Sequence, residues 1–390
     1  MKVLLWMGGC FDRRTASEHL LISIVQALYA RGHTVHIIQK DTDGPLHRLP
    51  KELTELGVTT DCIPCRLADK NKFFARYLIE LRYVWQCRKY ISQHKDCGAV
   101  FIQSNNTAGI VTYLVKRIIP KARLTYNVQD VFPENAACVG RTKGVVYKIL
   151  SAEQKYAYRH ADQIITISED MKKLLIEKGT EPEKTEVVYN WSYRDEPYRY
   201  EEVYHKEIAD ILCSDKFNVV YAGNIGIVQN VDIVVGAARI LQEDSDIQFH
   251  VWGDGADKER LQNSAKGLRN ISFWPMLPSD LAPSIYAMAD VNVIPLAPGI
   301  YRTALPSKTA TCIACQKPII FCFGEKSEFG QWVGSNEGCY VVDSSSEKEL
   351  AEMICVIKAQ KPAVHLEAMF RTYFSRTKNS QRYAALIAGD

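Results

Sequence analysis

The stretch DVNVIPLAPGIYRTALPSKTATCIACQKPII, residues 290–320, decides the fold of this chain. An apolar run at residues 291–296 predicts a buried strand, and a loop of small residues then leads to Pro306, Ser307 and Lys308, which open a predicted helix. Free backbone N–H groups and a partial positive charge make such a helix start a site for phosphate. The tripeptide alone fits an ordinary capped helix with a solvated lysine equally well. The rest of the chain has to decide between these two interpretations.

Strands and helices alternate along all 390 residues. Residues 2–7 predict a strand, residues 17–31 a helix and residues 34–39 a second strand, a βαβ unit of the kind that builds parallel sheets. Further strands are predicted at residues 99–103, 123–128, 163–168, 186–189, 216–222, 248–252, 270–274, 291–296 and 318–322. The predicted fold class is therefore α/β, with two Rossmann-like, doubly wound domains in tandem.

The predicted domains are residues 1–195 and residues 196–365, because the irregular, polar segment at residues 190–214 interrupts the alternation. Residues 366–390 read as one long amphipathic helix that packs on a domain surface, with a return to the first domain as one option. In sheets of this kind ligands bind outside the carboxyl ends of the strands.

The amino-acid composition limits the classes of protein to which this chain can belong. With 47% hydrophobic and 24% charged residues and a net charge of +3, the chain is an ordinary globular protein with no case for nucleic-acid binding. No apolar run reaches the roughly 20 residues that span a bilayer, so we expect a cytoplasmic protein whose 12 Cys are reduced. The CxxC pairs Cys62/Cys65 and Cys312/Cys315 fall on a predicted strand and a predicted helix, so packing explains them better than a zinc site.

Glycines follow three of the predicted strands, at residues 8–9, 223–226 and 253–255. They let backbone approach a ligand closely, but none forms a dinucleotide fingerprint or a P-loop. A second polar group, Gln129, Asp130 and Glu134, follows the strand at residues 123–128. These side chains suit binding of sugar hydroxyls or acceptance of a proton, and a plain helix cap is the alternative.

Residues 70–95 predict a helix with an apolar face beside basic residues. The apolar members are Phe73, Phe74, Tyr77, Leu78, Leu81, Val84 and Trp85, and the basic members are Lys70, Lys72, Arg76, Arg82, Arg88 and Lys89. We expect most of the apolar face to enter the core, while attachment to an anionic membrane surface stays open as the alternative.

Together these motifs resemble those of the family-4 glycosyltransferases of the GT-B fold, especially members that act in bacterial capsule, O-antigen and exopolysaccharide assembly. The matching segments, in order, are residues 8–9, 128–134, 160–168, 188–191, 220–226, 253–255, 290–295, 305–308 and 316–320. The resemblance implies two domains facing across a cleft. It also implies transfer of a sugar, with retention at the anomeric carbon and with no metal or other cofactor. The donor would be a nucleotide-sugar, on family grounds a UDP-sugar, and the acceptor a lipid-linked saccharide or an oligosaccharide.

The resemblance also implies three groups of site residues. The donor diphosphate would contact Gly8, Gly9, Gly223, Asn224, Gly226, Arg302, Ser307 and Lys308. The nucleoside would contact Gly253, Asp254, Gly255, Trp274, Pro275, Met276 and Thr311. Gln129, Asp130 and Glu134 would face the acceptor. The predicted catalytic residues are Asp130, Asn224 and Lys308, with no metal ligand among them.

This chain departs from the family pattern at two places. Thr303 and Thr311 stand where the family often has a pair of glutamates, and Asn224 and Gln229 stand where it commonly has Arg and Lys. Lys308, with Arg302 as a second candidate, would then carry more of the phosphate charge. Two alternatives to a transferase stay open: a nucleotide-sugar 2-epimerase of the same fold, and a non-catalytic subunit that binds a nucleotide-sugar.

Overall fold

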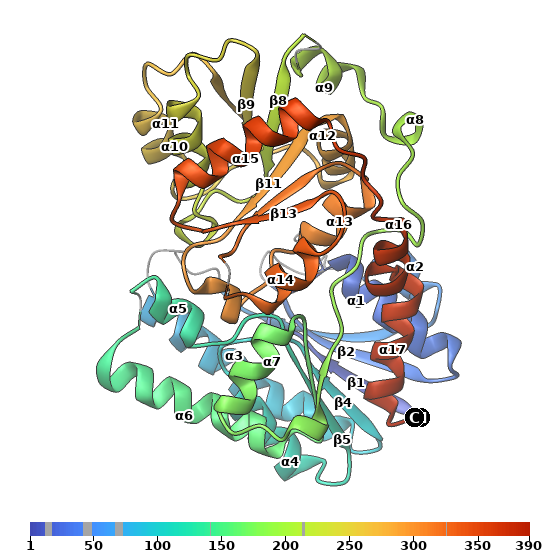
Figure 1. Ribbon diagram of the computed structural model, residues 1–390. Coiled ribbons are helices and arrows are strands. Elements are labelled where there is room, and N and C mark those ends of the chain that lie inside the picture. Colours follow the sequence, from blue (N-terminus) through green and yellow to red (C-terminus); the bar gives the residue numbers. More distant parts are fainter. Residues whose placement is uncertain (12–17, 42–48, 67–72, 141, 213–214, 325) are drawn as a thin grey trace. The chain divides into compact units, whose positions relative to one another are not determined.

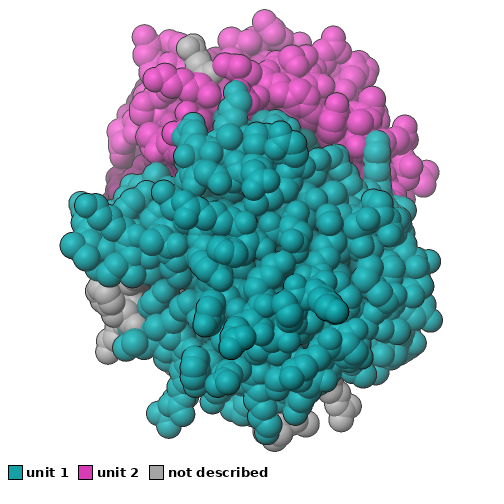
Figure 2. Space-filling model, turned by 90° about the horizontal axis from the view of Figure 1, so that it is seen from below, with its two compact units in different colours: residues 1–190, 376–390 teal, residues 191–375 magenta. Residues whose placement is uncertain are grey.

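The computed structural model describes residues 1–390 except 12–17, 42–48, 67–72, 141, 213–214 and 325. The chain forms two compact units, coloured separately in Figure 2. Unit 1 comprises Met1–Asn190 and Arg376–Asp390, and unit 2 comprises Trp191–Ser375. Unit 1 is therefore formed by two chain segments, one before and one after unit 2 in the sequence.

Unit 1 is built on a parallel sheet of seven strands in the order β3-β2-β1-β4-β5-β6-β7 (Figure 1). Its strands are β1 (Lys2–Trp6), β2 (Thr34–Asp41), β3 (Thr59–Pro64), β4 (Ala99–Ile102), β5 (Arg123–Val128), β6 (Gln163–Thr166) and β7 (Thr185–Val187). The inner strands are apolar and buried on both faces, as β1 and β4 show most clearly. A parallel sheet of this kind needs helices on both sides.

Two groups of helices supply those layers. On one face α1 (Glu18–Ala30) packs against α17 (Arg376–Ala388), and α17 also contacts β4, β5 and β6. On the other face α3 (Phe73–Gln93), α4 (Ala108–Ile118) and α6 (Gly144–His160) form a continuous layer. The shorter helices of unit 1 are α2 (Lys51–Thr54), α5 (Glu134–Cys138) and α7 (Glu169–Glu177).

Unit 2 repeats the pattern with six parallel strands in the order β10-β9-β8-β11-β12-β13. They are β8 (Phe217–Ala222), β9 (Ile247–Trp252), β10 (Ile271–Trp274), β11 (Val291–Pro295), β12 (Ile319–Cys322) and β13 (Cys339–Val342). Its helices are α8 (Tyr200–Val203), α9 (Lys206–Ile211), α10 (Asp232–Ile240), α11 (Lys258–Ser264), α12 (Ala282–Met288), α13 (Thr309–Ala314), α14 (Glu328–Gly334), α15 (Glu347–Gln360) and α16 (Glu367–Met369). The core between the sheet, α10 and α15 is aliphatic and tightly buried. Residues 190–214, predicted as a linker or a surface excursion, belong to unit 2 from Trp191 on, and α8 and α9 pack on α12.

The prediction of one long helix at residues 366–390 is wrong. The segment consists of α16, a π-helical turn (Phe370–Phe374) and α17, with an extended backbone at Ser375 between them. Ser375 has φ −66° and ψ 131°, and its hydroxyl donates to Asp195 within unit 2. The break falls where the chain passes from one unit to the other. Each helical piece therefore buries its apolar side chains in a different core.

The apolar face expected for α3 is also partly wrong. Leu78 and Trp85 are 65% and 66% exposed, whereas Tyr83, Val84, Cys87 and Ile91 are buried. The helix is rotated toward Tyr83 and Cys87 because both find partners in β1 and its loop: the Tyr83 hydroxyl donates to the Met7 carbonyl, and the Trp6 indole donates to Cys87 Sγ. Lys70 and Lys72, and the side chains of Phe73, Phe74 and Arg76, lie outside what the structure describes.

The described cysteines are all free thiols. Cys312 and Cys315 are buried in unit 2, which agrees with a packing role, and Cys62 and Cys65 are half-buried in unit 1. Among the helices of the described residues, none is long and apolar enough to cross a membrane.

Candidate functional site

The strand order of unit 2 reverses at one place. β8 pairs with β9 on one side and with β11 on the other, so the chain passes from one half of the sheet to the other between them. Loops that leave adjacent strands at such a switch point separate and leave room for a ligand at the carboxyl edge. The loops here are residues 223–226 after β8 and residues 296–308 after β11.

Two glycine turns interlock at this edge. A Cβ on Gly253 would lie 1.9 Å from the carbonyl oxygen of Gly223, and a Cβ on Gly255 would lie 2.1 Å from that of Ile225. Gly253 has φ +147°, a conformation that residues with side chains rarely adopt. The Ile225 N–H also donates to the Asp254 carbonyl at 2.8 Å. The loops after β8 and β9 are therefore fixed against each other, backbone to backbone.

The ammonium of Lys308 points into the turn after β8. Its Nζ lies 3.7 Å from the centre of the Tyr221 ring, and a Cβ on Gly223 would lie only 2.7 Å from it. Within the described part of the chain this buried nitrogen has no hydrogen-bond acceptor. Burial lowers the pKa of Lys308 from 10.5 to about 7, with a small opposing effect from Cys312. A buried cation that lacks a partner is the chemical complement of an anionic ligand.

Asn224 and its neighbours shape the turn itself. The Tyr221 hydroxyl donates to the Asn224 carbonyl at 2.5 Å, and the Asn224 side-chain amide donates to Gln229 Oε1 at 2.8 Å. These two bonds hold the turn rigidly. Gly226 is extended (φ −141°), and a Cβ there would meet the Gln229 side chain. Tyr221, Asn224 and Gln229 thus form one hydrogen-bonded group, and Lys308 lies beside it without an acceptor among the described residues.

The Pro306-Ser307-Lys308 segment differs from the prediction in one respect. The helix α13 begins at Thr309, so the tripeptide forms a turn before the helix instead of its first turn. The Thr309 N–H bonds the Pro306 carbonyl at 3.1 Å, which closes that turn. Ser307 is exposed, and the hydroxyl of buried Thr309 has no acceptor among the described residues. Thr309 is a polar group next to Lys308 that the sequence reasoning did not single out.

The two threonines that replace the family's glutamates have different surroundings. Thr303 is 2% exposed, and its hydroxyl donates to the Ile300 carbonyl, so it is turned into the loop. Thr311 is half-buried on the first turns of α13. Arg302 closes a short 3₁₀ turn, Ile300–Arg302, in the same loop. Thr303 therefore offers no side-chain group to a ligand in this arrangement.

The residues predicted around a nucleoside lie at the ends of β9 and β10, except Thr311, which lies on α13. Trp274 stacks on Trp252 with ring centres 5.8 Å apart, and its indole N–H donates to His250. Pro275 and Met276 follow it in exposed positions, and Met276 is 51% exposed. Lys258, which sequence reasoning missed, donates to the carbonyls of Gly253 and Trp274 at 2.7 and 3.1 Å. It joins the two strand ends, and only its place just after a glycine turn could have indicated it.

In unit 1 the carboxyl edge carries a chain of amides. Asn127 Nδ2 donates to Gln103 Oε1, and Gln129 Nε2 donates to Asn127 Oδ1. Asn190 Nδ2 donates to Gln129 Oε1 at 2.7 Å, and the Tyr383 hydroxyl of α17 donates to Asn127 Oδ1 at 3.1 Å. Gln129 was predicted to face the acceptor, but its amide is occupied within this network. Its partners are Asn127 of β5, Asn190 beyond β7 and Tyr383 of α17, and a local motif cannot reveal the last two.

The other predicted residues of unit 1 have distinct settings. Gly8 and Gly9 follow β1, the strand at the switch point of this sheet, and the Gly9 carbonyl accepts from the Lys40 N–H. Asp130 is exposed beyond β5. Glu134 forms an ion pair with Lys178 and accepts a hydrogen bond from Tyr147 at 2.7 Å, in the wall of a polar hollow between α5, α6 and α7. Glu134 is therefore paired with Lys178, and its contact with the acceptor stays a prediction.

Comparisons with known proteins match both units. Residues 21–191 match the family model described as "Glycosyl transferase 4-like domain", and residues 216–359 match "Glycosyl transferases group 1". The chain is 22% identical over 344 residues to the probable glycosyltransferase WbjE of Pseudomonas aeruginosa, covering 85% of this chain and 84% of WbjE. It is 29% identical over 221 residues to the putative colanic acid biosynthesis glycosyl transferase WcaI of Escherichia coli K12, covering 54% and 53%.

Solved structures resemble the whole fold. The crystal structure of Anabaena Alr3699/HepE in complex with UDP and glucose superposes with a TM-score of 0.71 at 16% identity, with both chains covered completely. WaaG, a glycosyltransferase of lipopolysaccharide biosynthesis, superposes with a TM-score of 0.65 at 16% identity, again over both complete chains. At these identities the resemblance establishes the fold, which is GT-B.

We predict that Lys308→Met stabilises the ligand-free chain. The pKa of Lys308 is about 7 when folded and 10.5 in the unfolded chain, so between these values the unfolded state binds more protons and stability rises with pH. The burial penalty is complete below about pH 7, where the variant should gain roughly 1–4 kcal/mol, and the gain should shrink as the pH rises. Thermal melts across this pH range measure it. Lys348→Met, at a side chain that is 79% exposed, is the matched control and should change little. An unchanged or lower Tm for Lys308→Met would contradict the assignment.

We also predict that Gly253→Ala destabilises unit 2 by about 2–4 kcal/mol in urea unfolding, because the new Cβ overlaps the Gly223 carbonyl and the backbone is strained. Gly267→Ala is the control, since Gly267 also has positive φ (+90°) but nothing within 4 Å. It should lose only the backbone term, about 1 kcal/mol. Equal losses in the two variants would mean that the turns do not interlock.

Proposed function

Since this chain belongs to the family-4 glycosyltransferases of the GT-B fold, we propose that it transfers a sugar from a UDP-sugar to a lipid-linked saccharide or an oligosaccharide in surface polysaccharide assembly. The transfer retains the configuration at the anomeric carbon and needs no metal. The name of WcaI, a colanic acid biosynthesis glycosyl transferase, supports the polysaccharide setting, and the UDP and glucose bound in HepE support the choice of donor.

The observation that carries this proposal is the unpaired ammonium of Lys308 at the switch point of the second sheet. A diphosphate beside Gly223 supplies the acceptors that Nζ lacks, and its charge raises the pKa of Lys308, so the lysine is fully protonated in the complex. The turn at residues 223–226 is fixed by its own hydrogen bonds, so little of it needs to be ordered when the donor binds.

The same groups favour the chemical step. As the bond between the anomeric carbon and the diphosphate oxygen breaks, negative charge grows on the leaving nucleoside diphosphate. Lys308 and the exposed hydroxyl of Ser307 stabilise that charge as it forms, and preorganised groups of this kind lower the barrier. Asp130, exposed at the carboxyl edge of unit 1, is our candidate for contact with the incoming acceptor hydroxyl.

A lipid-linked acceptor calls for contact with a membrane, and α3 offers a surface for it. Leu78 and Trp85 lie seven positions apart, on one side of the helix, and both are exposed. Arg88 lies over the Trp85 ring at 5.7 Å, and Arg82 and Lys89 are exposed nearby on the same helix. Exposed apolar residues among basic ones are what an anionic lipid surface binds. We propose that α3 attaches the protein peripherally to such a surface.

The expected test result for the transferase is release of UDP that depends on both donor and acceptor. The protein is incubated with a panel of nucleotide-sugars, with and without a lipid extract of membranes, and nucleoside diphosphate is measured. Lys308→Met should lower turnover by roughly tenfold or more, as removal of one positioned charge does, while Lys348→Met should match the wild type. Interconversion of the donor without acceptor would indicate an epimerase instead. Binding without turnover would indicate a non-catalytic subunit, and near-wild-type turnover in Lys308→Met would remove Lys308 from the site.

For membrane attachment we predict that Leu78→Glu/Trp85→Glu reduces co-sedimentation with anionic vesicles by roughly tenfold, because it removes apolar contact and adds repulsion. The control is Ile240→Glu/Val356→Glu, which makes the same charge change at exposed apolar residues of unit 2. Wild-type binding should also fall on vesicles of neutral lipid. Equal sedimentation of the two double variants would exclude α3 as the attachment surface.

A further inference from the structure

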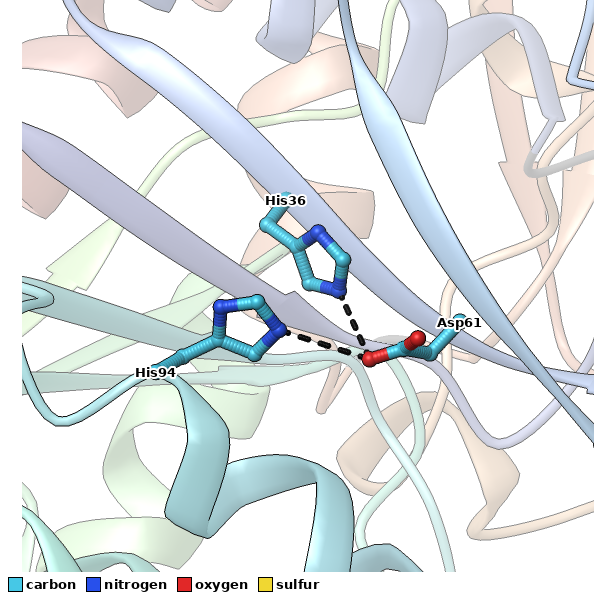
Figure 3. Close-up of side chains that lie close together, drawn as sticks. All are labelled: His36, Asp61 and His94. Atoms are coloured by element: carbon cyan, nitrogen blue, oxygen red, sulfur yellow. Dashed lines mark hydrogen bonds and ion pairs between the residues drawn. The ribbon is translucent and has the colours of Figure 1, made fainter.

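Three potential metal ligands from separate elements of unit 1 meet at one point (Figure 3). His36 lies in β2, Asp61 lies in β3, and His94 follows the last residue of α3. Asp61 Oδ2 is 3.0 Å from His36 Nε2 and 3.3 Å from His94 Nε2. In the part of the chain that the structure describes, these are the three His, Cys, Asp or Glu side chains that bring their ligand atoms within 4.8 Å of one another, as a metal site requires.

Sheet register explains why the first two ligands coincide. β2 and β3 are parallel, with His36 opposite Thr59 and Ile38 opposite Asp61. Because side chains alternate between the two faces of a sheet, His36, Thr59 and Asp61 project from the same face. This is the face that α3 contacts, and the end of that helix delivers His94. The pattern is not visible in the sequence, where His36 and Asp61 are 25 positions apart.

The spacing of the donor atoms fits a small divalent ion. Zn²⁺ binds imidazole nitrogen and carboxylate oxygen at about 2.0–2.2 Å in a tetrahedron, which places neighbouring donors about 3.3–3.6 Å apart. The two Nε2–Oδ2 distances are 3.0 and 3.3 Å, so only a slight opening is required. The imidazole rings are tilted by 33° with centres 3.8 Å apart, and both present Nε2 to the carboxylate.

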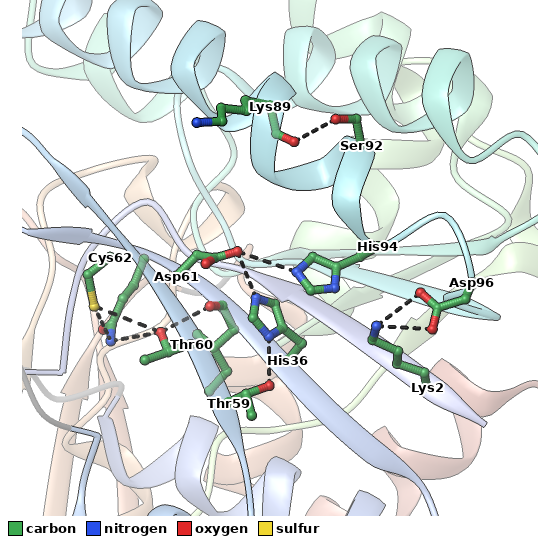
Figure 4. Close-up of polar contacts among 12 residues, drawn as sticks. Lys2, His36, Thr59, Thr60, Asp61, Cys62, Lys89, Ser92, His94 and Asp96 are labelled. Atoms are coloured by element: carbon green, nitrogen blue, oxygen red, sulfur yellow. Dashed lines mark hydrogen bonds and ion pairs between the residues drawn. The ribbon is translucent and has the colours of Figure 1, made fainter.

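The surroundings provide part of what a bound ion needs beyond its ligands, since His36 has a second partner and His94 Nδ1 has none among the described residues. His36 Nδ1 lies 2.7 Å from Thr59 Oγ1, which can accept a hydrogen bond from Nδ1–H and leave the Nε2 lone pair free for the metal (Figure 4). The nearby ammonium of Lys2 is held by both oxygens of Asp96, at 2.9 and 3.1 Å, which offsets its charge. The side chains of Asp61 and His94 are 25% and 14% exposed, so water can reach the fourth position.

We propose that His36, Asp61 and His94 bind one Zn²⁺, which clamps β2, β3 and the end of α3 together. Two imidazoles and one carboxylate favour zinc and its transition-metal neighbours over Mg²⁺ or Ca²⁺. His36 is the third residue of β2, whereas the predicted site residues follow the carboxyl ends of the strands. The ion is therefore structural and takes no part in sugar transfer.

The test uses the full chain without a polyhistidine tag, stripped with a chelator and titrated with ZnCl₂ in a calorimeter. We expect about one equivalent of zinc to bind the wild type, and Asp61→Asn and His94→Gln to weaken this binding at least tenfold. His365→Gln, at an exposed histidine of unit 2, is the control and should bind as the wild type does. Zinc should raise the Tm of the wild type and of the control but not of the two cluster variants. Circular dichroism checks that every variant is folded before titration.

Cobalt distinguishes this site from adventitious binding by the 12 cysteines. Co²⁺ bound by nitrogen and oxygen gives visible bands without the ultraviolet charge-transfer band of a thiolate ligand, and these visible bands should vanish in His94→Gln. A thiolate band in the one-equivalent complex would overturn the proposal. So would zinc binding that is unchanged in both cluster variants, or the absence of saturable binding to the wild type, which would leave the cluster a purely hydrogen-bonded contact.

Discussion

A parallel sheet exposes apolar side chains on both faces, and every strand of it must therefore be covered twice. In unit 1 the helices α1 and α2 connect β1, β2 and β3 and cover only half of one face of the sheet. The helices α3, α4 and α6 cover the other face. The rest of the first face, over β4, β5 and β6, is covered by α17, which follows unit 2 in the sequence. Tyr383 of this helix is 1% exposed and contacts Phe101 of β4. Because both faces of the sheet must be covered, the chain returns to unit 1 after it has formed unit 2.

The same strand order creates the candidate site. Reversal at β1 and at β8 separates neighbouring loops, and the structure fills those places with glycines, amides and one lysine. In unit 1 the amides of Gln103, Asn127, Gln129 and Asn190 bond one another in a chain. In unit 2 the buried nitrogen of Lys308, a cation when protonated, has no acceptor among the described residues. An unsatisfied buried cation destabilises the free protein and favours an anionic ligand, a common relation between stability and function.

Local patterns in the sequence were sufficient to predict most of the fold and the position of Lys308. The alternation of apolar runs and glycine turns predicted both α/β units, and Lys308 was found because a strand, a loop and a Pro-Ser-Lys segment follow one another in the chain. Features that depend on distant partners could not be predicted. The rotation of α3 follows from bonds to Met7 and Trp6, the break at Ser375 follows from the return of the chain to unit 1, and the meeting of His36 with Asp61 follows from sheet register. None of these leaves a periodic signal.

The position of α17 has a consequence for synthesis on the ribosome. The strands of unit 1 emerge first, but the helix that covers β4, β5 and β6 emerges only after the 185 residues of Trp191–Ser375. Until then part of an apolar sheet lacks its cover, a condition that invites association with other chains or with chaperones. Unit 2 is contiguous and can fold as it is made. The second unit in the sequence is thus free to finish folding before the first.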